Sequence, residues 1–143
     1  MALGMHIKEA KGRVLVIDDE PEVRKIVRHA LERSGYDVVE AEDGEKAIEA
    51  IRSGDNPLLT DVIICDVRMP KINGVEAVSF FREQFPSVPI IVLTGYPDMQ
   101  LATSFLKQGV MEYLVKPVEK EKLVETVEKA IESRGSGGDT FSA

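Results

Sequence analysis

The sequence contains a single cysteine, Cys65, and no apolar run that approaches the length of a membrane span. One cysteine can form neither an internal disulfide nor, by itself, a metal site. Because Cys65 lies within the apolar run 62–65, we interpret it as a small core residue. The N-terminal residues 1–12, MALGMHIKEAKG, lack the apolar centre of a signal peptide. These absences predict a cytoplasmic protein with no membrane-spanning segment.

Positive charge is also scarce. The chain has 18 Lys and Arg against 25 Asp and Glu, which gives a formal net charge of −7. A nucleic-acid-binding protein normally presents a basic face, so this balance argues against direct nucleic-acid binding. Neither His6 nor His29 has a second ligand or nucleophile beside it, and we interpret both as surface residues. The 143 residues suffice for one compact domain and are too few for two ordinary ones.

What the sequence does contain is an alternation of apolar runs and helical patterns. The apolar runs lie at 13–17, 37–41, 61–65, 89–93 and 110–115. Helical patterns fill the gaps between them, and one more follows the fifth run. Strands that alternate with helices at this spacing predict an α/β fold with a five-stranded parallel sheet that is doubly wound.

Capping residues and apolar spacing locate the helices. Pro21 suits a first turn and Gly35 a C-terminal cap, while Asp43 suits the N-cap of a helix over about 43–53. The predicted inward-facing residues are Val23, Ile26, Val27, Ala30, Leu31, Ala47, Ile48, Ile51, Ala77, Val78, Phe81, Phe85, Ala102, Phe105, Leu106, Leu123, Val127, Ala130 and Ile131. We expect a flexible leader at 1–11, one domain at 12–133 and a Gly/Ser-rich flexible tail or linker remnant at 134–143.

The carboxyl ends of the predicted strands carry polar side chains. Asp18 and Asp19 follow the first strand and Asp66 follows the third, whereas the fourth ends in Thr94 and the fifth in Lys116. In a parallel sheet with right-handed crossovers these ends meet at one edge, where ligands bind. Capping and solvation could explain any one of these residues alone, but they explain the five together poorly. The pattern therefore predicts a functional site.

The chemistry of this site follows from its residue types. Carboxylates close to one another repel, so the acidic group predicts a bound cation. Oxygen ligands without histidine or thiolate suit a hard ion, and Mg²⁺ is the usual one. A carboxylate beside that ion and beside Lys116 is placed to attack phosphorus, while the ion and the ammonium group neutralise the transferring phosphoryl group.

Four stretches, VLVIDDEP, IICDVRMPKINGVEAV, IIVLTGYPD and YLVKPVEKEKL, resemble the receiver domains of two-component response regulators. The resemblance covers about residues 12–133. It implies a flavodoxin-like sandwich with strand order 2-1-3-4-5. It also implies a signalling domain rather than an enzyme, one that assists its own phosphorylation and dephosphorylation.

The resemblance assigns roles to the acidic residues. Asp66 would accept a phosphoryl group from the phosphohistidine of a sensor histidine kinase or of a histidine phosphotransfer protein. Asp19 and Asp66, with the backbone carbonyl of Arg68, would hold Mg²⁺, and Asp18 would help through water.

The same resemblance assigns a switch. Lys116, which precedes an expected cis bond to Pro117, would contact the phosphoryl group. Thr94 would bond a phosphoryl oxygen after transfer, and Tyr113 would swing inward behind it. The output would then be a downstream protein effector or a missing output domain, with the chain a monomer or a phosphorylation-dependent dimer.

Two large side chains are expected to tune the lifetime of the phosphorylated state. The resemblance implies that the side chains two residues after the phosphoacceptor and two after the switch threonine flank the path of the hydrolytic water, and here these are Arg68 and Tyr96. Arg68 supplies no base to orient that water, and its donors could hold phosphoryl oxygens or a nearby acid. Tyr96 is bulky enough to screen the approach. We therefore expect a comparatively long-lived phosphoprotein.

The sequence disfavours two alternative functions and leaves a third open. A phosphatase of the haloacid dehalogenase type needs an acid where this chain has Arg68, which is a poor proton donor near neutral pH. A flavodoxin binds phosphate in the loop after the first strand, and the acidic sequence DDEPE at 18–22 would repel it. The remaining alternative is the receiver portion of a longer DNA-binding or enzymatic regulator, cut at its linker.

Overall fold

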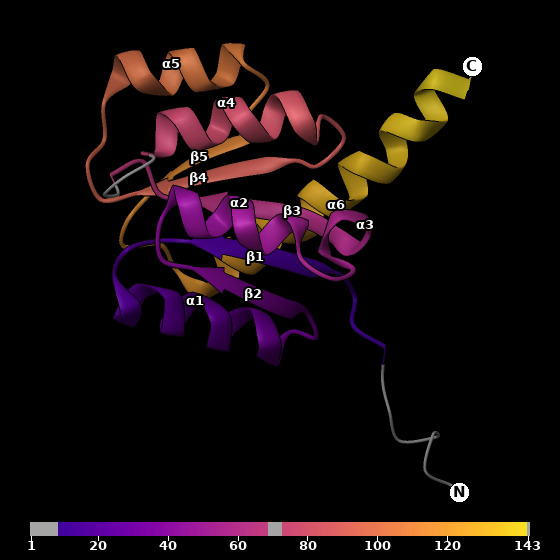
Figure 1. Cartoon of the computed structure of the whole chain (residues 1–143), viewed down its shortest axis with the longest axis horizontal. Coiled ribbons are helices and arrows are strands. Elements are labelled where there is room, and N and C mark those ends of the chain that lie inside the picture. The colour runs from indigo at the N-terminus through magenta and orange to yellow at the C-terminus, as the bar shows by residue number, and fades with distance from the viewer. Residues whose placement is uncertain (1–8, 69–72, 143) are drawn as a thin grey trace, which may run out of the picture.

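Five parallel strands form a single sheet at the centre of the fold. The structure is a computed structural model, which describes residues 9–68 and 73–142. The strands are β1 (Arg13–Ile17), β2 (Asp37–Ala41), β3 (Thr60–Cys65), β4 (Ile90–Thr94) and β5 (Glu112–Val115). Their order across the sheet is β2-β1-β3-β4-β5 (Figure 1). The predicted α/β class and the strand order 2-1-3-4-5 are confirmed.

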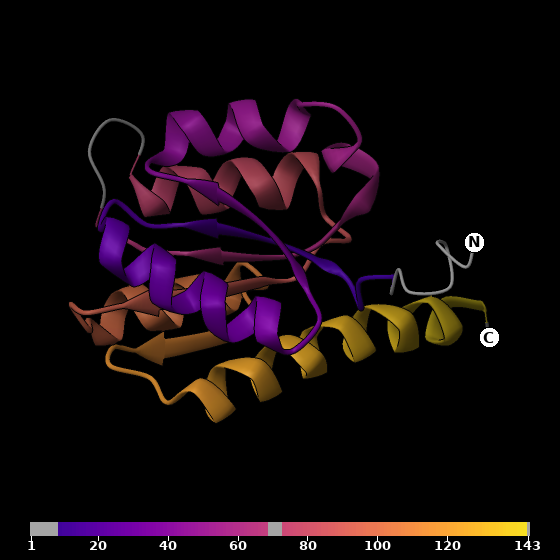
Figure 2. The same ribbon diagram turned by 90° about the horizontal axis from the view of Figure 1, so that it is seen from below.

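Helices connect the strands and cover both faces of the sheet. They are α1 (Pro21–Arg33), α2 (Gly44–Arg52), α3 (Asn56–Leu59), α4 (Gly74–Gln84), α5 (Met99–Lys107) and α6 (Lys120–Ser142). Figure 2 shows α1 and α6 on one side of the sheet, with α2 and α4 on the other. The short helix α3 was not predicted, because a single turn is too short for an apolar period to be recognised.

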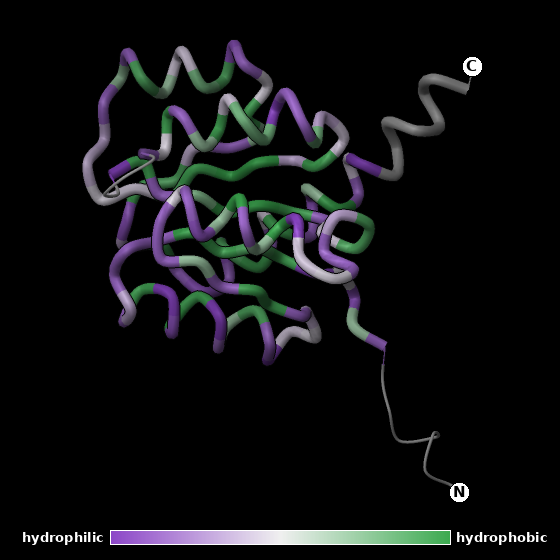
Figure 3. Tube along the Cα trace, in the orientation of Figure 1, coloured by the Kyte–Doolittle hydropathy of each residue, from purple (hydrophilic) through white to green (hydrophobic). Residues whose placement is uncertain are grey.

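Each face of the sheet has its own core. Leu15 and Ile17 of β1 pack with residues of α2, α4 and α5, whereas Val14 and Val16 pack with residues of α1 and α6. Successive residues of a strand point to opposite faces, so a strand that is covered on both faces is apolar throughout. Figure 3 shows this pattern, with hydrophobic central strands and helices that alternate in hydropathy. The apolar runs of the sequence therefore locate the strands to within two residues.

Capping residues begin and end the helices as predicted. Pro21 is the first residue of α1, and Gly35 has a φ of +97° just after its end. The side chain of Asp43 accepts a 2.8 Å hydrogen bond from a backbone amide of the first turn of α2. Asn73 and Asp98 cap α4 and α5 in the same way. These side chains satisfy backbone donors that a helix leaves unpaired.

Two residues that were predicted to face the core are exposed. Ile26 has an exposed fraction of 57% and Leu106 of 53%, while the other predicted positions are buried or partly buried. The buried residues of α1 are Val27, Ala30 and Leu31. A surface helix buries a stripe somewhat wider than about 100°, so an apolar residue at its margin faces solvent. The prediction is wrong for these two residues.

The last helix is longer than the sequence predicts. Flexible residues are expected over 134–143, whereas α6 is helical to Ser142. Nη1 of Arg134 donates to the carbonyl oxygen of Thr60 at 3.1 Å and to Oδ1 of Asp61 at 3.2 Å. These contacts hold α6 against the start of β3. Beyond them, each further helical residue adds one backbone hydrogen bond to an existing helix, which is easier than starting one.

The division of the chain into a leader at 1–11, a domain at 12–133 and a tail at 134–143 otherwise stays a prediction. Residues 1–8 lie outside the described part of the chain. Among the helices that the structure describes, none is long and apolar enough to cross a membrane.

Candidate functional site

The carboxyl ends of four strands bring the predicted side chains to one edge of the sheet. Asp18 follows β1, Asp66 follows β3, Thr94 ends β4 and Lys116 follows β5. Asp18, Asp66 and Thr94 are buried, with exposed fractions of 2%, 3% and 0%, while Asp19 is exposed. Because a buried carboxylate is costly without compensation, two of them at one edge require a positive charge nearby.

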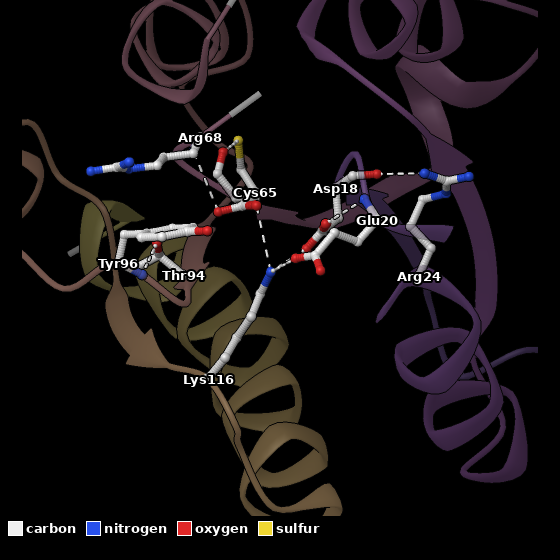
Figure 4. Close-up of polar contacts among 9 residues, drawn as sticks. Asp18, Glu20, Arg24, Cys65, Arg68, Thr94, Tyr96 and Lys116 are labelled. Atoms are coloured by element: carbon white, nitrogen blue, oxygen red, sulfur yellow. Dashed lines mark hydrogen bonds and ion pairs between the residues drawn. The ribbon is translucent and has the colours of Figure 1, made fainter. Parts of the chain in front are cut away.

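Lys116 supplies such a charge. Its Nζ lies 2.7 Å from Oδ2 of Asp18, 3.5 Å from Oδ2 of Asp66 and 3.4 Å from Oε1 of Glu20 (Figure 4). The backbone amide of Lys116 donates to the carbonyl oxygen of Thr94 at 2.8 Å, which ties the end of β5 to β4. The expected cis peptide bond between Lys116 and Pro117 is present. The ammonium group is thus held between the two buried carboxylates and closer to Asp18.

The surroundings of the site change its acid–base properties. Burial has the largest effect on the pKa of Asp66 and raises it. The charge of Asp18 raises this pKa further, and Lys116 opposes the increase. Burial alone would lower the pKa of Lys116, but the hydrogen bond to Asp18 and the nearby negative charges outweigh it, and that pKa is raised. Lys116 is therefore positively charged at neutral pH, whereas the negative charge of Asp66 is disfavoured by burial and by Asp18.

Four carboxylates gather within reach of one ion. One oxygen each of Asp18, Asp19, Glu20 and Asp66 lies within 4.8 Å of the others. Oxygen donors of this kind suit a hard divalent cation such as Mg²⁺. Glu20 was not assigned as a ligand from the sequence, although it follows the aspartate pair directly. A role for the Arg68 carbonyl as a ligand stays a prediction.

Thr94 and Tyr113 lie on the same face of neighbouring strands. Tyr113 pairs with Val92, two residues before Thr94, and residues two apart on a strand share a face. Oγ1 of Thr94 accepts a 3.0 Å hydrogen bond from the amide of Tyr96, and the Tyr113 hydroxyl accepts one of 3.1 Å from the amide of Asp98. Both side chains thus hold the loop between β4 and α5. An inward swing of Tyr113 stays a prediction.

Arg68 and Tyr96 meet at the rim of the site. The guanidinium group of Arg68 lies over the Tyr96 ring (Figure 4), and both residues are exposed. The amide of Arg68 donates to Oδ1 of Asp66 at 3.4 Å. The structure therefore brings together the two residues that were expected to tune the phosphorylated state, although their effect on its lifetime stays a prediction.

Two further residues hold the backbone of the site. Nη1 of Arg24 donates a 2.6 Å hydrogen bond to the carbonyl oxygen of Asp18. A Cβ atom at Gly74 would lie 2.4 Å from the carbonyl oxygen of Asp66 and 2.4 Å from Cα of Val67, so only glycine fits there. Neither role was predicted, because both contacts join separate segments of the chain and leave no local pattern in the sequence.

The buried thiol of Cys65 is part of the same strand end. Its Sγ lies 3.2 Å from the carbonyl oxygen of Asp66, and burial raises the pKa of the thiol. A thiol that is buried and protonated is unreactive. The interpretation of Cys65 as a core residue is confirmed.

Comparison with known proteins places this geometry in context. Residues 14–128 match the family model described as the response regulator receiver domain. The transcriptional regulatory protein ZraR of Escherichia coli (strain K12) is 32% identical over 118 residues, which are 82% of this chain and 26% of that protein. The DNA-binding transcriptional regulator NtrC of Proteus hauseri is 31% identical over 121 residues, which are 85% of this chain and 25% of that protein. The chain thus spans about a quarter of the length of these relatives.

Solved structures agree in fold and extent. A response regulator receiver domain protein from Clostridium thermocellum superposes with a TM-score of 0.81 at 31% identity, and the match covers 87% of this chain and 97% of that one. The chemotaxis protein CheY4 of Vibrio cholerae superposes with a TM-score of 0.75 at 33% identity, over 85% of this chain and 99% of that one.

Proposed function

Because this chain belongs to the family of response regulator receiver domains, we propose that it accepts a phosphoryl group on Asp66. The donor is the phosphohistidine of a sensor histidine kinase or of a histidine phosphotransfer protein. The observation that carries the proposal is the position of Asp66, which is buried at the end of β3 and lies 3.5 Å from Nζ of Lys116. A reacting carboxylate needs such a fixed place and a neighbouring cation.

The transfer follows from these positions. A carboxylate oxygen of Asp66 attacks phosphorus, the phosphorus–nitrogen bond of the phosphohistidine breaks, and its electron pair stays on the imidazole nitrogen. Lys116 is already positively charged, so it can pair with the oxygens of the phosphoryl group without a proton transfer. The raised pKa of Asp66 reflects unfavourable burial of its negative charge, and formation of the acyl phosphate moves negative charge outward onto the phosphoryl oxygens.

The acidic residues provide the metal site. Asp19 and Asp66, with the backbone carbonyl of Arg68, would hold Mg²⁺, and Asp18 would help through water. The oxygen-only cluster of carboxylates supports the assignment of the three aspartates. Bound there, the ion supplies charge neutralisation for the transferring group. The domain assists its own phosphorylation and dephosphorylation in this way, and its product is a changed protein conformation rather than a released compound.

The output is a change of state that a partner reads. Thr94 would leave its hydrogen bond to the Tyr96 amide for a phosphoryl oxygen, and Tyr113 would then move inward on the same face of the sheet. The relatives ZraR and NtrC are transcriptional regulators that are about four times longer than the matched region. These relatives favour a second candidate, in which this chain is the receiver portion of a longer regulator in the cytoplasm and its partner is an attached output domain.

Labelling of the purified protein tests the phosphoacceptor. The wild type should take up one phosphoryl group from a phosphorylated histidine phosphotransfer protein or from acetyl phosphate, and only with Mg²⁺ present. Asp66→Asn should remain unlabelled. Asp98→Asn, which keeps the capping oxygen of α5, is the matched control and should label normally. Labelling of Asp66→Asn at the wild-type level, or labelling that survives a strong chelator, would contradict the proposal.

A further inference from the structure

Arg24 links the first helix to the backbone of the acidic site. Its Nη1 donates a 2.6 Å hydrogen bond to the main-chain carbonyl oxygen of Asp18 (Figure 4). The side chain of Arg24 is only 15% exposed. A charged donor that is held this close to a carbonyl oxygen makes a strong hydrogen bond, and its burial limits competition from water.

A carboxylate on the neighbouring strand aims this guanidinium group. Oε1 of Glu40 lies 3.2 Å from Nε of Arg24, and Oε2 of Glu40 lies 2.6 Å from Nη1 of Arg28. Glu40 belongs to β2 and pairs with Val16 of β1, so it is fixed beside the strand that ends at Asp18. Because a guanidinium group is planar, a bond at Nε sets the direction in which Nη1 can donate.

The bond matters because it fixes the peptide group that joins Asp18 to Asp19. The amide of Asp18 donates to Ala41 at 3.1 Å, and Oδ1 of Asp18 accepts from the amide of Glu20 at 2.9 Å. These bonds secure the residues on either side, and the bond from Arg24 secures the carbonyl between them. Asp19 is exposed, and the peptide plane that precedes it sets the direction in which its side chain leaves the backbone.

We propose that Arg24 is a positioning residue for the divalent cation site. Through its bond to the Asp18 carbonyl it holds the peptide plane that aims the Asp19 carboxylate at the ion. Arg24 does not touch the ion and is not a ligand. This inference rests on the proposed Mg²⁺ site.

Electrostatics and positioning make opposite predictions for the loss of Arg24. A guanidinium group near a cation site repels the ion, so removal of its charge alone should strengthen binding. Loss of a group that orients a ligand weakens binding, typically by about tenfold or more. Arg28 is the matched control, because it carries the same charge and contacts the same carboxylate, but its ion pairs are with Glu40 and Glu32 and not with Asp18.

Titration of the full chain with Mg²⁺ tests the inference. Binding is monitored through the backbone amide signals of residues 17–20 in nuclear magnetic resonance spectra. We expect Arg24→Gln to bind Mg²⁺ about tenfold more weakly than the wild type, and Arg28→Gln to bind equally or more tightly. Arg24→Lys keeps the charge but loses the planar fork, and it should also bind more weakly. Unchanged chemical shifts elsewhere in the apo variants report that the fold is intact.

The outcomes separate the two proposals. If the wild type binds Mg²⁺ and Arg24→Gln binds it equally or more tightly, the positioning role is overturned while the metal site stands. Equal weakening in Arg24→Gln and Arg28→Gln would also overturn the role, because it would trace the effect to Glu40. If Arg24→Gln does not fold, Arg24→Lys decides by the same comparison. A wild type that binds no Mg²⁺ overturns the proposed site and this inference with it.

Discussion

The guanidinium carbon of Arg68 lies 4.2 Å from the centre of the Tyr96 ring. A cation over an aromatic face at this distance is attracted to it. The two residues follow β3 and β4, so their contact bridges two loops at the rim of the site (Figure 4). From its donors alone, Arg68 is expected to hold phosphoryl oxygens or an acid. In the structure its guanidinium group covers the ring of Tyr96 instead, and the pair forms one surface.

This pair should slow the loss of the phosphoryl group. Hydrolysis needs a water in line with phosphorus, and we expect the two large side chains in contact at the rim to obstruct its approach. We expect the double variant Arg68→Asn with Tyr96→Glu to lose the phosphoryl group about tenfold faster than the wild type, equivalent to about 1.4 kcal/mol in the barrier. The decay of the labelled protein after removal of the donor measures this rate.

The single variants serve as controls for this prediction. Because the side chains touch, the effects of Arg68→Asn and Tyr96→Glu should not add, and either one alone should release part of the obstruction. A double variant that decays as slowly as the wild type, or more slowly, would end the screening hypothesis.

Thr94 should be dispensable for phosphorylation and necessary for the response. Its hydroxyl is bonded to the loop between β4 and α5, and loss of this bond is the expected first step of the switch. Phosphorylation of the wild type should perturb the amide signals of residues 94–115 well beyond the contact shell of Asp66. Thr94→Ala should label but show a weak perturbation, whereas Thr94→Ser, which keeps a hydroxyl, should respond. An equal spectral change in Thr94→Ala and the wild type would refute the coupling.

Asp66 should reduce the stability of the metal-free protein at neutral pH. Burial, with the charge of Asp18 second, raises its pKa above that of the unfolded chain. Folding therefore favours the protonated form of Asp66. The contribution of this form to the free energy of unfolding is complete below the unfolded pKa of about 4 and is lost as pH rises through the folded pKa. In chelator, Asp66→Asn should raise Tm at pH 7 and flatten this part of the pH profile. Thermal unfolding at a series of pH values measures Tm for both proteins. Identical profiles of Tm against pH for the variant and the wild type would contradict the prediction.

Gly74→Ala should destabilise the fold at the site. The added methyl group would lie 2.4 Å from the carbonyl oxygen of Asp66, and such overpacking typically costs about 1–3 kcal/mol. Gly95→Ala is the control, because its methyl group would meet only Cδ of Lys116, at 3.8 Å, and should change stability by less than about 0.5 kcal/mol. Urea unfolding measures both. Equal stabilities would show that the loop yields easily.

The sheet and the residues at its edge were predictable because they follow from periodicity and topology. A strand that is covered on both faces must be apolar, so β3 is visible as an unbroken run. Once the strands are parallel, their carboxyl ends must meet, and this brings Asp66 and Lys116 together although 50 residues separate them.

The remaining features depend on contacts that sequence patterns do not encode. The position of Ile26 at the margin of the buried stripe depends on the rotation of α1 against the sheet. The continuation of α6 follows contacts of Arg134 with the start of β3. The bond of Arg24 to the Asp18 carbonyl needs the actual geometry of the loop after β1. Each of these features depends on how the elements pack in three dimensions, and neither a hydrophobic period nor a sequence motif encodes it.

The contacts of Arg134 with Asp61 lie at the opposite end of β3 from Asp66. Six residues of strand span about 20 Å, which exceeds the screening length of about 8 Å in physiological salt, and both side chains of the ion pair are about a third exposed. Charge changes at this end of the sheet, such as those that a tether or a reporter introduces, should therefore leave the electrostatics at Asp66 unaltered. The bonds of Arg134 would have to be kept, because they hold α6 against β3.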